Sequence, residues 1–125
     1  MKTKIFVYGT LKKGFHNHGF LDSATYIGDA WTKKEYTLLT DHYNGLPYVI
    51  REPSYPIQGE LYEVDEFTFM TIDNLEGHPH FYYRELVDLF IPLSKDKQID
   101  ERGWLYFLGD DFDTRAVRKN PTGLW

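Results

Sequence analysis

Short apolar runs separated by polar breaks recur along the chain and predict a domain built mostly from β-strands. Residues 5–8 form a continuous apolar run between a lysine and a glycine, a pattern typical of a buried central strand. Residues 81–91 give the strongest strand pattern of the chain, ended by Pro92, and residues 103–108 supply a partner strand. The charged stretch 94–100 is expected to be the turn between them.

Further strands are expected at 36–39, 48–50 and 57–64. The stretch 51–56, which joins the last two, contains two prolines. Because proline cannot donate a hydrogen bond to a sheet, this stretch is predicted to be a loop.

One helix interrupts the strand pattern. Asp65 is a suitable N-cap and Gly77 a suitable C-cap, so a helix is predicted between them. Phe69, Ile72 and Glu76 are spaced by three and four residues, which puts them on one face of this helix. The pattern therefore places a carboxylate on the same face as two apolar side chains.

The order of these elements favours an α+β domain, a small mixed or antiparallel β-barrel with one or two short helices. A doubly wound fold would need several crossover helices, which the sequence does not provide. A chain of 125 residues has the length of one domain, so residues 1–125 are expected to share one core. The mostly polar tail from about residue 109 is expected to pack over one end of the domain or to fray.

Composition narrows the class of function. Aromatic residues make up 18% of the chain, which indicates a packed β-rich core with tyrosine hydroxyls available at a pocket rim. The net charge of -5 and the scattered basic residues argue against a nucleic-acid partner. With no cysteine, disulfides and thiolate chemistry are excluded. The first apolar run is too short for a signal peptide or a membrane span, so a cytoplasmic protein without membrane contact is expected, either a monomer or a homodimer.

The first strand breaks into a candidate binding loop, Tyr8, Gly9, Thr10 and Leu11. Glycine permits a positive φ or a close backbone approach, so successive N–H groups of this loop could converge on an oxygen acceptor. The nearby Asn17 and His18 are expected either to fix the loop by bonding its backbone or to contact a substrate directly.

Glu76 is the candidate acid. Partial burial would raise its pKa toward a value at which it can both accept and return a proton. Its position at the C-terminal end of a helix also disfavours a negative charge. The alternative is a structural carboxylate paired with Arg84 or a surface lysine. Tyr82 and Tyr83 begin the following strand and point to opposite faces, so one of them is expected to line the space that Glu76 faces.

Other chemistries find little support. The pairs His16 and His18, and His78 and His80, lack the carboxylate or cysteine pattern that would reinforce a metal site, so no metal is predicted. The segment from Gly9 to Gly14 does not match a phosphate-binding loop, and no serine-hydrolase motif occurs.

The chain resembles the gamma-glutamylcyclotransferase-like superfamily and, within it, the gamma-glutamylamine cyclotransferase branch. The motifs that carry the resemblance are Phe6-Val7-Tyr8-Gly9-Thr10-Leu11-Lys12-Lys13-Gly14 followed by Asn17-His18, then Leu46-Pro47, Gly59-Glu60-Leu61-Tyr62-x-Val64-Asp65, and Leu75-Glu76 leading to Tyr82-x-Arg84.

The resemblance implies a small mixed barrel that cyclises a gamma-glutamyl group to 5-oxoproline, releases the attached amine and uses no cofactor. It implies that Glu76 is the general acid and base, that the main chain of residues 8–11 grips the substrate, and that Tyr82 is the aromatic that follows, with Tyr83 one residue away as the alternative. Tails close over the pocket in such folds. A non-catalytic module that binds a small acyl or amino-acid ligand remains the alternative function.

Overall fold

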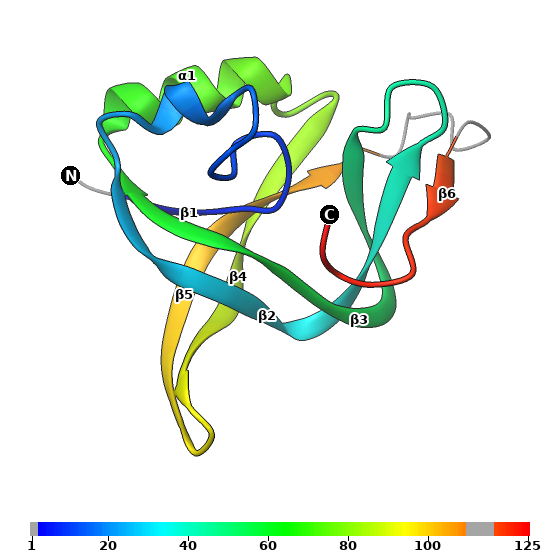
Figure 1. Ribbon diagram of the computed structural model, residues 1–125. Helices are drawn as coiled ribbons and strands as arrows, with labels where there is room; N and C mark the ends of the chain where they lie inside the picture. The colour runs from blue at the N-terminus through cyan, green and yellow to red at the C-terminus, as the bar shows by residue number, and fades with distance from the viewer. Residues whose placement is uncertain (1–2, 110–116) are drawn as a thin grey trace.

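The computed structural model describes residues 3–109 and 117–125 of the chain. Strands dominate it, with one α-helix and one short 3-10 helix in the described part (Figure 1). In chain order the elements are β1 (Thr3–Val7), η1 (His18–Leu21), β2 (Thr25–Asp41), β3 (Pro47–Val64), α1 (Glu66–Glu76), β4 (Tyr82–Ser94), β5 (Lys97–Leu108) and β6 (Val117–Lys119).

The strands pair in the order β3-β1-β5-β4-β2-β6, and β2 also pairs with β3. The first five strands therefore form a closed ring of pairings. β1 runs parallel to β5, whereas the other described pairings are antiparallel, so the sheet is mixed. The predicted α+β class is confirmed. No described helix has both the length and the apolar character needed to cross a membrane.

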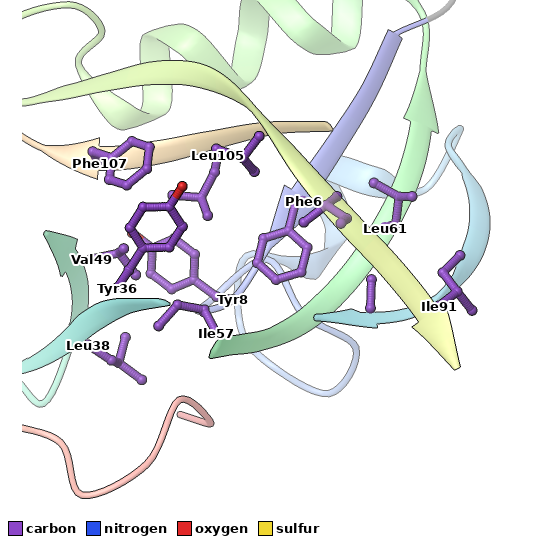
Figure 2. Close-up of a cluster of buried hydrophobic side chains, with 13 residues drawn as sticks. Phe6, Tyr8, Tyr36, Leu38, Val49, Ile57, Leu61, Ile91, Leu105 and Phe107 are labelled. Atoms are coloured by element: carbon purple, nitrogen blue, oxygen red, sulfur yellow. The ribbon is translucent and has the colours of Figure 1, made fainter. Parts of the chain in front are cut away.

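β1 is buried on both of its faces, as its continuous apolar run predicts. Phe6 belongs to the cluster inside the ring, where it packs with side chains from the other strands (Figure 2). Ile5 and Val7 point the other way, into a second cluster that includes Ile72 of α1. This alternation places the end of β1 between the sheet interior and the helix.

The helix forms where its capping residues predict it. The Asp65 carboxylate accepts a hydrogen bond from the Thr68 backbone N–H at 2.8 Å. Gly77 ends α1 in the left-handed conformation, with φ of 67°. Ile72 is fully buried and Phe69 and Glu76 are half-buried, so the predicted face does point toward the body of the protein.

The prediction of a loop at 51–56 is wrong, because these residues lie within β3. Thr37 pairs with Ile50 while Tyr36 pairs with Tyr55, so the register shifts within this stretch and 51–54 have no partner in the described β2–β3 register. Pro53 lies in this unpartnered stretch, and Pro56, opposite Glu35, lies beside a second register shift, so the missing N–H groups are tolerated.

The hairpin of β4 and β5 is longer than predicted. β4 continues through Pro92 to Ser94, and β5 begins at Lys97, so the expected turn at 94–100 shrinks to two residues. Pro92 lies beside a register shift, where a missing donor is tolerated. Figure 1 shows this hairpin projecting away from the helix.

The tail expected from residue 109 lies partly on 110–116, outside the described residues. Beyond them, its described part begins with β6 and lies against the sheet. β6 pairs antiparallel with the end of β2, from Asp41 opposite Val117 to Leu39 opposite Lys119.

Candidate active site

A pocket of about 390 Å³ opens between the end of β1, the end of α1 and the start of β3. Loops and strand ends supply most of its wall, which is where binding residues commonly lie on a rigid scaffold. The lining includes the predicted site residues Tyr8, Gly9, Thr10, Leu11, Glu76 and Tyr82, and also Asn17, but not His18.

Gly9 makes the turn out of β1 possible by close approach. A Cβ atom added at this position would lie 2.7 Å from the Pro47 Cγ, too close for a side chain. Its φ is not among the positive values, so of the two predicted uses of glycine only the close approach applies. Because Gly9 has no side chain, the loop after β1 can pack closely against Pro47 at the start of β3.

Asn17 and His18 hold this loop, as one of the two predicted roles states. The Asn17 backbone N–H donates to the Thr10 carbonyl at 3.1 Å, and its side-chain amide donates to the Thr10 hydroxyl at 2.9 Å. His18 Nδ1 donates to the Leu11 carbonyl at 2.8 Å. These bonds turn the carbonyl groups of the loop toward the protein.

The N–H groups of the loop are left for another acceptor. None of the hydrogen bonds found within the described residues uses the backbone N–H of Gly9, Thr10 or Leu11. Because β1 ends at Val7, these amides also lie outside the sheet ladder. A cluster of successive N–H donors at a pocket wall suits a carboxylate or an oxygen that gains negative charge.

Glu76 is the only acidic side chain among the described residues that line the pocket, which include no lysine or arginine. Burial raises the pKa of its carboxyl group from the ordinary 4.5 to about 7. In the described part of the chain its side chain makes no ion pair or hydrogen bond. The acid is therefore poised to exchange a proton near neutral pH.

The structural alternative for Glu76, a pair with Arg84, is wrong. Arg84 binds Asp73 instead, with Nε 2.8 Å from Oδ1 and Nη2 3.1 Å from Oδ2. The Tyr106 hydroxyl donates to the same Asp73 carboxylate at 2.6 Å. Burial acts to raise the pKa of Asp73, but the hydrogen bonds from Arg84 and Tyr106 outweigh it and hold the pKa below its usual value.

Of the four tyrosines that line the pocket, Tyr8, Tyr82 and Tyr106 lie close enough to Glu76 to feel its charge. The Tyr8 hydroxyl donates to the Tyr106 carbonyl at 2.8 Å, and the Tyr82 hydroxyl donates to the Pro47 carbonyl at 3.2 Å. Burial is the main cause that raises the pKa values of Tyr8 and Tyr82 above the usual range, and the nearby Glu76 charge adds to it. The phenol groups therefore stay neutral, and their hydrogen bonds fix them as part of the pocket lining.

Tyr82, and not Tyr83, lines the pocket. Tyr83 lies on the other face of β4, where its ring stacks on Phe107 with centroids 5.6 Å apart. Its hydroxyl accepts a hydrogen bond from Arg51 Nε at 3.1 Å.

Sequence reasoning missed several lining residues, among them Tyr106, Tyr48, Asn44, Phe81 and His16. Tyr106 lies on a strand that was predicted, but its place in the wall follows from the parallel pairing of Ile5 with Trp104. No local signal in the sequence reports that pairing. The described residues hold no cluster of three or more metal-ligating side chains.

Comparison with known proteins gives one consistent family. The model for gamma-glutamyl cyclotransferase, AIG2-like proteins matches residues 5–125. A provisionally named gamma-glutamylcyclotransferase of Methanocaldococcus jannaschii is 45% identical over 105 residues, which cover 82% of each chain. The gamma-glutamylaminecyclotransferase of Rattus norvegicus is 38% identical over 87 residues, which cover 64% of this chain and 58% of the rat protein.

The fold agrees with this match. The crystal structure of an AIG2-like protein from Mus musculus superposes with a TM-score of 0.74 at 26% identity, covering 98% of this chain and 93% of the mouse chain. An uncharacterised protein from Pyrococcus horikoshii superposes with a TM-score of 0.69 at 28% identity, covering 98% of this chain and 88% of that chain.

Proposed function

This chain belongs to the gamma-glutamyl cyclotransferase, AIG2-like family and is an enzyme, and on that premise we propose that it cyclises a gamma-glutamyl amine or a related conjugate. The products are 5-oxoproline and the free amine, and Glu76 is the general acid and base. The observation that carries the proposal is a half-buried carboxyl group with a pKa of about 7 and no ion pair among the described residues, on the same pocket as the open N–H groups of 9–11.

The reaction needs one proton to move twice. The neutral α-amine of the substrate attacks its own γ-carbonyl carbon, and the Glu76 carboxylate accepts the proton that the nitrogen loses. The protonated Glu76 then donates this proton to the leaving nitrogen as its bond to the γ-carbon breaks. The ring amide and the free amine leave, and Glu76 returns to its ionised form.

A pKa of about 7 suits both halves of this cycle. A carboxylate with the ordinary value would be too weak a base for the attack, and a stronger base would hold the proton when the amine must leave. Burial without a neutralising cation therefore tunes Glu76 for a double role.

The amides of Gly9, Thr10 and Leu11 are the proposed donors for the carbonyl oxygen or the α-carboxylate of the substrate. The γ-carbonyl oxygen gains negative charge in the tetrahedral intermediate, and fixed N–H donors stabilise such charge without reorganising. Nucleophile and carbonyl belong to one molecule, so much of the remaining catalysis consists of holding the substrate in a bent conformation.

Release of 5-oxoproline, measured by mass spectrometry over a panel of gamma-glutamyl amines and dipeptides, tests the proposal. Glu76→Gln should abolish release while the protein still folds and binds. Glu66→Gln is the matched control, because Glu66 is an exposed acid at the other end of α1. Release of product by the Glu76→Gln variant would remove Glu76 from the mechanism. No product from any substrate, with ligands still bound, would favour the non-catalytic binding module.

A further inference from the structure

The chain from Asn120 onward runs along β2 and β3 and returns toward the loop that follows β1. The Asn120 backbone N–H donates to the Leu38 carbonyl at 2.8 Å, and its carbonyl accepts from the Tyr55 hydroxyl at 2.5 Å. The Gly123 carbonyl accepts from the Gln58 N–H at 2.9 Å. Figure 1 shows this red segment curling back toward the blue loop that follows β1.

Trp125, at the end of this path, reaches two loops that carry pocket-lining residues. The first, named here the amide loop, comprises residues 8–18; the second, named the facing loop, comprises residues 41–47, from the end of β2 to the start of β3. Trp125 Nε1 donates to the Gly45 carbonyl of the facing loop at 2.9 Å. Its ring packs on Phe15 of the amide loop with centroids 4.8 Å apart.

Lys12 adds a second connection between Trp125 and the amide loop. Its Nζ donates to the backbone oxygen of Trp125 at 2.5 Å and lies 5.7 Å from the Trp125 ring centroid and 5.2 Å from that of Phe15. Only 6% of Lys12 is exposed, and this burial lowers its pKa. Lys12 does not line the pocket, so its contacts are structural.

Each of the two loops is braced internally and can act as one unit. In the facing loop the Asp41 carboxylate accepts from the backbone N–H groups of Tyr43 at 2.7 Å and Asn44 at 3.1 Å. The Asp41 N–H donates to the Leu46 carbonyl at 2.9 Å. The hydrogen bonds of Asn17 and His18 do the same for the amide loop.

We propose that Trp125 is a positioning residue that joins the amide loop to the facing loop and thereby sets the width of the pocket. The close packing of Gly9 on Pro47 fixes the inner end of the two loops, and Trp125 fixes the outer end. This inference rests on the proposed function for its kinetic consequence. The N–H donors lie on the amide loop, so a loosened outer end would misplace them and weaken substrate binding.

The test compares Trp125→Ala, Trp125→Phe and Lys12→Met with the native protein. Trp125→Phe retains a ring for Phe15 but loses the donor to Gly45. Leu124→Ala is the matched control, because the Leu124 side chain is 50% exposed and the hydrogen bonds found for this residue use its backbone. Two readouts are taken: steady-state kinetics over a pH series, and amide hydrogen exchange of both loops.

Trp125→Ala should raise KM on the order of tenfold and speed exchange in both loops together. The midpoint of the pH profile should stay at its native value, since Glu76 keeps its surroundings. Trp125→Phe and Lys12→Met should give smaller changes of the same kind, and Leu124→Ala should behave as the native protein.

Native KM and native exchange in the Trp125 variants would overturn the inference, and so would a shifted pH midpoint with unchanged loops. If the native protein releases no 5-oxoproline, the proposed function fails, while the exchange comparison still decides whether Trp125 joins the loops. If Trp125→Ala does not fold, KM and amide exchange of Trp125→Phe decide whether the inference holds.

Discussion

Asp73 and Glu76, three residues apart on α1, have carboxyl groups whose pKa values are displaced in opposite directions. Asp73 is bonded to Arg84 and Tyr106, whereas burial without a cation acts on Glu76. One acid of the helix therefore stabilises the wall of the pocket, and the other is available for proton transfer.

The pH dependence of activity should report Glu76. If its ionised form is the base, kcat/KM should rise with pH through a midpoint near the pKa of about 7, and loss of the proton from the substrate α-amine, with an ordinary pKa of about 8, adds a second rise above it. Rates measured from about pH 4 to pH 9 would show both the expected limb and one displaced toward the ordinary value. A midpoint near the ordinary value of 4.5 would contradict the role of burial.

Glu76→Gln should stabilise the protein at alkaline pH. The folded pKa lies above the unfolded value, so the folded state binds the proton more tightly, and stability is lost as pH rises from 4.5 toward about 7. A neutral Gln avoids this loss, with an expected gain of about 1–3 kcal/mol above pH 7 and little gain below the unfolded pKa.

Urea unfolding at both ends of that range measures the effect, with Glu66→Gln as the control because its side chain is exposed. An equal loss of stability for Glu76→Gln at both pH values would mean that the carboxylate makes structural bonds.

Asp73→Asn should destabilise the fold at neutral pH, and the difference from the native protein should shrink in acid, once the Asp73 carboxylate itself is protonated. The substitution leaves the half-buried guanidinium of Arg84, which packs against the rings of Phe69 and Trp104, without its carboxylate. A loss of about 2–4 kcal/mol in the free energy of unfolding is expected. Tyr106→Phe removes a single hydrogen bond and should cost about 1 kcal/mol. Equal effects of the two variants would argue against a dominant role for the ion pair.

Gly9→Ala should impair activity by displacing the amide loop. The new methyl group would meet Pro47 Cγ at 2.7 Å, whereas a Cβ at Gly19 would meet nothing within 4 Å. Gly9→Ala is therefore expected to cost about 1–3 kcal/mol and to lower kcat/KM, with Gly19→Ala near neutral. Pro47→Ala in the same chain should restore part of the loss, measured as a double-mutant cycle. Native kinetics for Gly9→Ala would show that the loop tolerates the shift.

Local signals allowed part of this structure to be predicted. The caps Asp65 and Gly77 fixed the ends of α1 because each acts through bonds to residues a few positions away. The apolar run of β1 likewise predicted burial on both faces. The predicted site residues came from the same local patterns and from the family resemblance, and they line one pocket.

The predictions fail where the structure depends on contacts between residues that are far apart in the sequence. The two register shifts, one at Pro53 and one beside Pro56, depend on how β2 meets β3. Whether Arg84 reaches Glu76 or Asp73 depends on how β4 packs against α1, and the place of Tyr106 depends on the pairing of β1 with β5. Spacing along the sequence contains none of this information.

Glu76 is the last residue of α1, directly before the left-handed Gly77. A negative charge at this point opposes the carbonyl dipoles of the final turn, so ionisation should promote fraying of that turn. The protonation state of the acid and the winding of the helix end are thus one coupled equilibrium. Under the proposed function, each turnover that moves the proton would also tighten and loosen the last turn of α1.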